Sequence, residues 1–307
     1  MTRPVLDLVV LGDCNPDLVL EGGNIEPVFG QVERLVDDAR LVVGGSGAIM
    51  ACGAARLGLA TSLIAVVGDD PLGRFMLDAL RERGVIVDGV RVDPERPTGV
   101  SVVLLRDGDR AILTATGAID RLGVDPIDPA AVGSARHVHV SSYFLQRGLH
   151  AVLPAVLERA RAGGATTSVD PNWDPRGDWD SGLLDTLPLV DVLLCNAEEA
   201  VRLAREQDVE AAARSLGERG PLVVIKLGGE GALACRGEHV AQVAADPIEV
   251  VDTVGAGDSF DAGFLAATLG GRGLDDALAI AVACGSLSTR APGGTAAQAT
   301  RDEAGLG

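Results

Sequence analysis

A length of 307 residues suits one large α/β domain, and a composition that is 47% hydrophobic but only 3% aromatic requires a core of Ala, Val, Leu and Ile. The formal net charge of −18 disfavours nucleic acid as a partner, because that binding draws on Lys and Arg. Five scattered cysteines without a CxxC pair argue against a disulfide framework or a zinc ribbon, and no secretion signal or membrane-length apolar stretch is visible, so we expect a soluble cytoplasmic protein.

The first part of the chain alternates between two kinds of segment. Apolar runs at 5–11 and 61–67 predict strands, each ended by glycine. Segments 48–57 and 71–83 are rich in helix-forming residues and predict helices. The pattern is therefore strand, helix, strand, helix.

The second half repeats this rhythm. We expect strands at 165–169, 191–195 and 222–227 and helices at 149–161, between 197 and 219, at 256–269 and at 274–289. Such alternation predicts a mostly parallel sheet with helices on both faces, which places ligands at the carboxyl ends of the strands. The last dozen residues are small and polar, and we expect them to be frayed.

One stretch breaks the alternation. Two β-rich runs at 98–106 and 110–116 flank Asp107-Gly108-Asp109, a hairpin turn signal. Segments 17–21 and 31–36 could add strands to this hairpin. We expect a small sheet outside the main layers, within a single domain of residues 1–307.

This small sheet has two expected roles. As a lid, it would be formed by about residues 15–43 and 97–116 and would cover the substrate. As a dimer surface, it would bury the apolar positions Val100, Val102 and Leu104 of the hairpin, because unpaired strand edges and exposed apolar faces attract partners. We therefore expect a homodimer.

The strongest chemical signal is the segment D-T-V-G-A-G-D-S-F at 252–260, directly before a helical run. The small residues Gly255, Ala256 and Gly257 let backbone amides converge on an anion at a helix N-terminus. Asp258, in the first turn, could accept a proton from an attacking hydroxyl group. Taken alone, Asp258 could equally complement the helix dipole. The segment fits neither a Walker A loop nor a dinucleotide fingerprint.

This segment resembles the second signature of the ribokinase-like (PfkB) carbohydrate kinases, and the match continues through Phe264. Gly44-Gly45-Ser46-Gly47, followed by 54–58 and 67–73, resembles the first signature. The resemblance covers about residues 5–295. It implies a three-layer α/β/α fold with a small β-sheet lid, ATP and Mg²⁺ as cofactors, Asp258 as the catalytic base and residues 255–257 as the anion hole.

The segment 12–17 resembles the family's sugar-binding segment, in which Asn15 and Asp17 would bind substrate hydroxyls. Asn, Pro and Asp are also ordinary turn formers, so a plain turn is the alternative. The expected substrate set is completed by Gly44, Gly45, Ser46, Ile49 and Ser142. Ile49 stands where many relatives carry Asn, and Ser46 where ribokinase has Lys, so the substrate cannot be copied from ribokinase.

Four further elements concern the nucleotide and ions. Asn196 and Glu199 resemble the family's Asn-x-x-Glu, which positions Mg²⁺ and phosphates through water, although the same pattern caps a helix. Lys226, Gly228 and Gly231 resemble the nucleotide loop, which with Asn196 and Gly257 completes the nucleotide set. Asp252 and the loop 290–294 resemble the monovalent-cation (K⁺) site of some members. Asp170-Pro171-Asn172 resembles a segment near the phosphate path, but Asp174 follows where the family often has Arg.

The leading hypothesis is phosphorylation of a sugar or sugar-like molecule by ATP. The alternatives are a nucleoside kinase of the same fold, because Ile49 would tolerate an apolar base, and a noncatalytic sugar-binding regulator. A Rossmann oxidoreductase is disfavoured because the chain lacks an early glycine fingerprint. The histidines lack metal-ligand spacing, and we expect His137 and His139 to be structural and to point to opposite faces of a strand.

Overall fold

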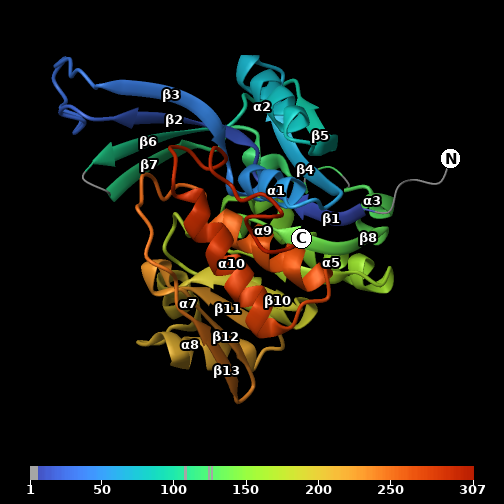
Figure 1. Cartoon of the computed structure of the whole chain (residues 1–307). Coiled ribbons are helices and arrows are strands. Elements are labelled where there is room, and N and C mark those ends of the chain that lie inside the picture. Colours follow the sequence, from blue (N-terminus) through green and yellow to red (C-terminus); the bar gives the residue numbers. More distant parts are fainter. Residues whose placement is uncertain (1–5, 107–108, 124, 126) are drawn as a thin grey trace.

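A nine-stranded sheet forms the centre of the protein in a computed structural model that describes residues 6–106, 109–123, 125 and 127–307 (Figure 1). Its strands run in the order β13-β12-β11-β10-β9-β8-β1-β4-β5. Seven of them are parallel to their neighbours, and β12 and β13 are antiparallel additions at one end. The strands are β1 (Leu6–Leu11), β4 (Thr61–Gly68), β5 (Ile86–Asp93), β8 (Ala135–Val140), β9 (Thr166–Val169), β10 (Val192–Asn196), β11 (Leu222–Lys226), β12 (Ala232–Arg236) and β13 (His239–Val243).

Helices cover both faces of this sheet, as the alternation of the sequence predicts. Successive residues of β1 point to opposite faces, so Leu8 joins one buried cluster and Val9 the other. The helices are α1 (Ser46–Arg56), α2 (Pro71–Glu82), α3 (Pro129–Gly133), α4 (Arg147–His150), α5 (Leu153–Ala162), α6 (Leu183–Thr186), α7 (Ala197–Ala204), α8 (Val209–Gly217), α9 (Ala256–Leu269) and α10 (Leu274–Ser288). Within the described residues, 3₁₀ turns lie at Ile119–Arg121, Tyr143–Leu145, Leu187–Leu189 and Gly228–Glu230.

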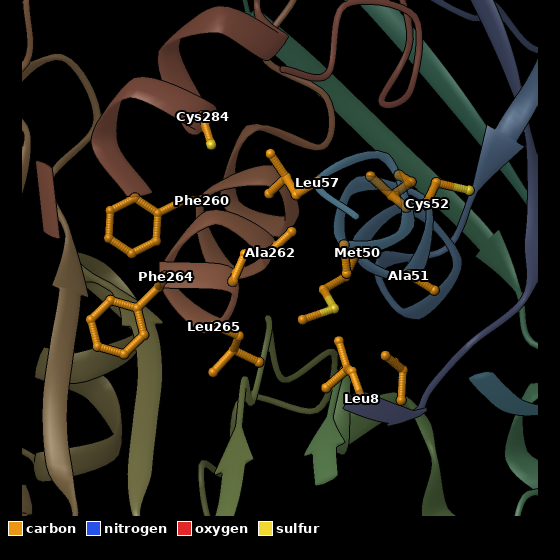
Figure 2. Close-up of a cluster of buried hydrophobic side chains, with 14 of the residues drawn as sticks. Leu8, Met50, Ala51, Cys52, Leu57, Phe260, Ala262, Phe264, Leu265 and Cys284 are labelled. Atoms are coloured by element: carbon orange, nitrogen blue, oxygen red, sulfur yellow. The ribbon is translucent and has the colours of Figure 1, made fainter. Parts of the chain in front are cut away.

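The face that carries α1, α9 and α10 contains the elements that later form the site. Figure 2 shows Met50 of α1 and Leu265 of α9 meeting Leu8 of β1, with Phe260 and Phe264 on the side of α9 toward other strands. Helix α9 is buried along most of its length, which explains why its sequence is almost free of charge after the first two turns. This packing fixes the N-terminus of α9 over the sheet.

A second, four-stranded sheet in the order β3-β2-β6-β7 stands to one side of the main sheet (Figure 1). We call it the small sheet; its strands are β2 (Asn15–Glu21), β3 (Asp38–Gly44), β6 (Val100–Arg106) and β7 (Asp109–Ala115). Its existence outside the main layers agrees with the sequence analysis. Residues 107–108 of the predicted hairpin turn lie outside the described residues.

The predicted strand at 31–36 is wrong. Residues 38–44 form the strand instead, because they pair with β2 in unbroken register from Asp38 to Gly44. Val32 and Leu35 made 31–36 look like a strand, but they are 51% and 81% exposed in the loop that precedes β3. The apolar side chains of 31–36 therefore suggested a strand, although β2 pairs with the following segment instead.

Two other expectations also need correction. The helix predicted at 149–161 is divided into α4 and α5, because Pro154 occupies the first turn of α5. The C-terminal residues are not frayed: Ala304 and Leu306 are buried, and Arg56 Nε donates to the Gln298 carbonyl at 2.6 Å. Small side chains here let the last segment pack against α1. Among the described helices, none has both the length and the apolar content needed to span a membrane.

Candidate active site

A cleft of about 970 Å³ opens where the strand ends of the main sheet face the small sheet. The inner face of the small sheet, the N-termini of α1 and α9, and the residues that end β10 and β11 or follow β9 line it. The segment 245–250 after β13 and the C-terminal half of α10 also contribute to the lining. The location matches the expectation that ligands bind beyond the carboxyl ends of parallel strands. Most sequence-predicted site residues line it: Asp17, Gly45, Ser46, Ile49, Asn196, Glu199, Lys226, Gly228, Gly231, Gly255, Ala256, Gly257 and Asp258.

The N-terminus of α9 forms one wall of the cleft. Gly255 precedes the helix with a φ of 72°, and a β-carbon there would lie 2.7 Å from Gly294 Cα and 2.9 Å from Ile49 Cγ2. Only glycine suits both the left-handed backbone and this close approach. Gly255, Ala256 and Gly257 line the cleft at the N-terminus of α9, which is the kind of position where backbone N–H groups and the helix dipole favour an anion.

Asp258 lies in the first turn of α9 and is only 9% exposed. Burial, followed by the negative charge of Asp170, raises the pKa of its carboxyl group to about 8. The positive charge of Lys226 and a hydrogen bond from Ser46 act in the opposite direction. A raised pKa makes the ionised carboxylate a stronger base, so Asp258 can serve as a proton acceptor once it has lost its own proton.

Lys226 occupies a buried position beside the same helix end. Its Nζ atom lies 2.7 Å from Asp170 Oδ2 and 3.2 Å from each oxygen of Asp261, which is on α9. A β-carbon on Gly257 would be 3.4 Å from this nitrogen. Burial alone would lower the pKa of Lys226, but the two carboxylates raise it well above its ordinary value. The sequence analysis assigned Lys226 to the nucleotide loop. In the structure its ammonium group lies in an ion cluster beside residues 255–257 at the N-terminus of α9, which we call the anion-binding wall.

The opposite wall belongs to the small sheet. Asp17 of β2 pairs with Ser101 of β6, whose hydroxyl lies 3.0 Å from that of Thr114 on β7, and all three line the cleft. Asn15 lies behind them and donates to Ser101 Oγ at 3.2 Å. Gly44 is needed on the neighbouring strand, because a β-carbon there would lie 2.0 Å from Asp17 Oδ1.

Burial, followed by the charge of Asp13, raises the pKa of Asp17, which is about 7. A hydrogen bond from Ser101 and the charge of Arg110 lower it. The result is a row of hydroxyl and carboxyl groups that can exchange hydrogen bonds with a polyhydroxy ligand.

Four predicted site residues do not line the cleft: Asn15, Gly44, Ser142 and Asp252. Ser142 is fully buried and accepts a hydrogen bond from Asn172 Nδ2 at 3.1 Å. The same amide donates to Ser46 Oγ at 2.7 Å, so Ser142 holds a residue that lines the cleft.

Comparison with known proteins agrees with this geometry. The profile described as "pfkB family carbohydrate kinase" matches residues 5–301. The chain belongs to the PfkB family of carbohydrate kinases.

A fructokinase from Klebsiella pneumoniae is 31% identical, with 96% of each chain covered. An ATP-dependent ribose-1-phosphate kinase from Halopiger xanaduensis is 33% identical, with 93% of each covered. Among solved structures, Arabidopsis thaliana ribokinase complexed with ribose and ATP has a TM-score of 0.84 at 26% identity, with 98% of each chain covered. This chain is thus a sugar kinase with the ribokinase-like three-layer fold.

The kinase carries Asn196 and Glu199 at the start of α7. Asn196 Oδ1 accepts from the Glu199 backbone N–H at 2.9 Å, and Glu199 Oε2 accepts from the Asn196 N–H at 2.8 Å. This is a capping box, so the structural alternative for the pair is present. Glu199 is also buried at the cleft, and burial followed by the charge of Asp170 raises its pKa to about 7.

These residues fit a particular kind of Mg²⁺ site. Within the described part of the chain, no group of three or more His, Cys, Asp or Glu side chains is arranged to hold a metal ion. Mg²⁺ commonly keeps several waters and is held by one or two carboxylates together with substrate phosphates. The buried carboxylate of Glu199, which lines the same cleft as residues 255–257, fits that mode.

Asp252 connects two backbone segments behind the anion-binding wall through hydrogen bonds of its carboxylate. Its Oδ1 accepts from the Val254 N–H at 2.9 Å and its Oδ2 from the Gly293 N–H at 2.8 Å. The carboxylate therefore ties the 252–255 segment to the loop that contains Gly293. A monovalent cation at this position stays a prediction of the resemblance.

Asp174 follows the segment Asp170-Pro171-Asn172-Trp173, where the family often has Arg. Its two oxygens accept from the backbone N–H groups of Arg176 at 2.9 Å and Trp179 at 2.7 Å. The side chain is 3% exposed and shapes the loop instead of contacting a phosphate. The basic contact expected from the family is absent from the described lining of the cleft on this loop.

The sequence analysis missed several cleft residues. Asp13, which accepts from the Gly47 N–H at 2.8 Å, could have been found, because it belongs to the quoted 12–17 segment. Arg110 and Trp173 also line the cleft, but neither stands in a recognisable pattern. His137 and His139 do not point to opposite faces: both contact Ser168 Oγ at 2.7 Å, because residues two apart in a strand share a face.

Proposed function

We propose that this kinase transfers the γ-phosphoryl group of ATP to a hydroxyl group of a sugar or sugar-like molecule, with Asp258 as the general base. The observation that carries the proposal is the position of the Asp258 carboxyl group. It lies in the first turn of α9, whose N-terminal residues Gly255, Ala256 and Gly257 line the cleft with it. The fructokinase and ribose-1-phosphate kinase relatives support a sugar as the acceptor.

The arrangement supports the following chemistry. Asp258 accepts the proton of the substrate hydroxyl as its oxygen attacks the γ-phosphorus. Backbone N–H groups of residues 255–257 donate to the oxygens of the transferring group, where charge accumulates. Mg²⁺, when bound, would neutralise phosphate charge, with Glu199 and Asn196 holding its waters. Support for ATP and Mg²⁺ comes from an Escherichia coli protein of the same fold, described as a ribokinase II and solved with both (TM-score 0.86, 24% identity).

The small sheet is the proposed lid of a single kinase domain, formed by about residues 15–43 and 97–116. Its inner row of Asp17, Ser101 and Thr114 faces the wall that carries Asp258. Hydroxyl groups of the substrate would bind between them, supported from behind by Asn15. A site built to pair hydroxyl groups discriminates strongly against analogues that lack them.

A nucleoside kinase is the second candidate, because the cleft also offers apolar surface. Trp173 is 45% exposed at the cleft, and Ile112 of the small sheet is 53% exposed there. Together with Ile49, these residues could contact a planar base. Asp258 would have the same role.

A homodimer through the small sheet is also proposed. The face turned away from the cleft carries an apolar row in which Leu18 pairs with Leu41 and Val102, and Val102 pairs with Leu113. Leu41 is 44% exposed and Leu113 62% exposed. A second copy would remove this surface from water.

The test is a phosphoryl-transfer assay with ATP and Mg²⁺ on a panel of fructose, ribose, ribose 1-phosphate, 2-dehydro-3-deoxygluconate and adenosine, with detection of products by mass. We expect at least one sugar to gain one phosphoryl group and the activity to vanish in Asp258→Asn. A nucleoside as the only product would favour the second candidate. Absence of any phosphorylated product would contradict both.

A further inference from the structure

Asn172 occupies a constrained position in the loop after β9. Its φ of 55° lies in the left-handed region that few residues other than glycine adopt, and its backbone N–H donates to Asp170 Oδ1 at 2.8 Å. The Trp173 N–H donates to Asn172 Oδ1 at 2.9 Å, which identifies this atom as the oxygen and leaves the Nδ2 group for other partners. The amide of Asn172 therefore has one defined orientation at the cleft that it lines.

The amide nitrogen of Asn172 binds two hydroxyl groups at once. Nδ2 donates to Ser46 Oγ at 2.7 Å and to Ser142 Oγ at 3.1 Å. Ser46 is the first residue of α1, and Ser142 lies just after β8, so the amide joins three separate parts of the cleft wall. An amide NH₂ group can only donate, so both hydroxyl oxygens act as acceptors and keep their own hydrogens for another partner.

Each of these hydroxyl groups also meets a carboxyl group of the cleft. Ser46 forms a hydrogen bond with Asp258. Ser142 forms one with Asp13. A hydrogen bond donated to a carboxylate favours its ionised form, and in both cases it acts against the larger effect of burial, which raises the pKa of the carboxyl group. The amide of Asn172 is thus connected to the proposed base through a single hydroxyl group.

Charged groups from several elements also act on Asp258. After burial, which has the largest effect, the charge of Asp170 raises its pKa, that of Lys226 lowers it and that of Asp13 raises it. Asp261 lies on the same helix, and its pKa is raised by burial first and, among other groups, by the charge of Asp258. These charges stay in place when a neutral amide or hydroxyl group is removed. Variants of the amide and of the hydroxyl therefore test the hydrogen bonds separately from the charges.

We propose that Asn172 is a positioning residue for the phosphoryl transfer proposed above, on which this inference rests. By donating to Ser46 Oγ, it turns the hydroxyl hydrogen of Ser46 toward the Asp258 carboxylate, which favours and orients the ionised base. The remaining lone pairs of the carboxylate are free to take the proton of the acceptor hydroxyl. Neither Asn172 nor Ser46 gains or loses a proton in the reaction. The resemblance placed this segment near the phosphate path, whereas here its amide serves the base.

A double-mutant cycle tests this connection. Asn172→Gly removes the amide but suits the left-handed backbone, and Ser46→Ala removes the hydroxyl. Because the base must be ionised, kcat/KM rises with pH; we expect each variant to move this rise to higher pH and to lose about tenfold in kcat/KM at pH 7, the low end for a hydrogen bond to a charged group. The double variant should stay within about twofold of the larger single loss, because the two groups act in series. Ser134→Ala, which removes an exposed hydroxyl that donates to the Ala131 carbonyl, should match wild type.

Asn172→Asp reverses the direction of the hydrogen bond. It keeps the oxygen that accepts from the Trp173 N–H but replaces the donor by an acceptor, so Ser46 would donate to residue 172 instead of Asp258. We expect a larger move to high pH than in Asn172→Gly, because a negative charge is also added. A pH profile that stays at its wild-type position in Asn172→Gly, or losses that multiply in the double variant, would overturn the positioning role. So would a loss confined to the acceptor KM, which would mean that Asn172 binds the acceptor directly.

NMR of the carboxyl carbons makes the same comparison on the free enzyme without any substrate. The Asp258 signal, assigned by its absence from Asp258→Asn, should titrate at higher pH in Asn172→Gly and Ser46→Ala than in wild type, and unchanged in Ser134→Ala. An unmoved titration in the first two variants would overturn the inference on Asn172 even if the kinase is active. A wild-type protein that phosphorylates no acceptor on the panel would instead overturn the proposed function, and the positioning role in catalysis with it.

Discussion

The ammonium nitrogen of Lys226 lies 2.7 Å from Oδ2 of Asp170, and both groups are buried directly beside the helix end that carries Asp258. Buried pairs of this kind often contribute little net stability, because desolvation offsets their attraction. Their effect on a neighbour is clearer. Burial is the largest cause of the raised pKa of Asp258, and the charge of Asp170 raises this pKa further while the charge of Lys226 lowers it, so the pair adjusts the proton affinity of the proposed base.

Replacing Lys226 by Met tests this relationship. We expect a loss of about 3–5 kcal/mol in unfolding free energy, since Asp170 and Asp261 would remain buried without their cation. The pKa of Asp258 should rise, which moves the rising limb of the profile of kcat/KM against pH to higher pH. Lys226→Arg keeps the charge and should shift the limb less. Denaturant unfolding and pH profiles of the three proteins provide the measurement; an unmoved limb in Lys226→Met would contradict the assignment.

Asp258→Asn should remove turnover while the protein stays folded. The amide keeps the size of the carboxyl group but cannot accept the proton, so we expect a loss of about 10²–10⁴-fold in kcat with nearly unchanged ATP affinity. Asp275 is a matched control, because it is an exposed Asp in the first turn of α10. If Asp258 only complemented the helix dipole, the two substitutions would behave alike, and Asp258→Asn would keep more than a tenth of wild-type turnover.

The wild-type enzyme should also show a specific pH dependence. With a pKa of about 8 in the free enzyme, Asp258 is ionised in only a small fraction of molecules at pH 6, so kcat/KM should rise with pH and level off above about 8. A bell centred below pH 6 would be incompatible with this base.

The same pKa has a consequence for stability. A carboxyl group whose pKa is higher in the folded than in the unfolded protein stabilises the fold most fully at low pH. That stability is lost as pH rises toward about 8. Asp258→Asn should therefore exceed wild type in Tm by more at pH 9 than at pH 5, as thermal unfolding at both values can show.

The sequence predicted those elements whose ends are marked locally. Helix α9 occupies the predicted range because Gly255 and Gly270 flank it. The strand predicted at 31–36 was wrong, because β3 is the segment that pairs with β2. That segment is Asp38–Gly44, and the pairing cannot be read from the local sequence.

Side-chain partners were harder still to predict. Lys226 and Asp261 are 35 residues apart, on a strand and a helix that only the folded core brings together. Arg110 carried no signal, because its partner Thr253 lies 143 residues away. The cleft could thus be located from motifs, whereas its electrostatics required the structure.

Dimer formation through the small sheet predicts a sensitive position on its outer face. Leu113→Lys should give a monomer by light scattering at micromolar concentration, because a charge would be buried in the apolar row. Val92→Lys is the control, since Val92 is 44% exposed on β5, in the main sheet. A monomeric wild-type protein would refute the proposed dimer, while the lid could still close.

The last prediction concerns specificity. Ile49 lines the cleft and packs against Gly255 and Gly294, at a position where many relatives carry Asn, so the wild-type site lacks one polar contact. Ribose should therefore be a poorer substrate than an acceptor with an apolar or less hydroxylated part. Ile49→Asn should raise kcat/KM on ribose or fructose relative to the preferred acceptor.

Two further variants separate the effect of polarity at position 49 from the effect of side-chain volume and from a general loss of acceptor binding. Ile49→Val changes the volume without adding a hydrogen-bonding group, so it should leave the ranking of substrates as it is. Asp17→Ala should weaken every acceptor by about 1–3 kcal/mol in transition-state binding, because their hydroxyl groups lose a partner. The same panel, measured as kcat/KM for each variant, decides the matter. An unchanged ranking in Ile49→Asn, or full activity in Asp17→Ala, would mean that the acceptor binds elsewhere in the cleft.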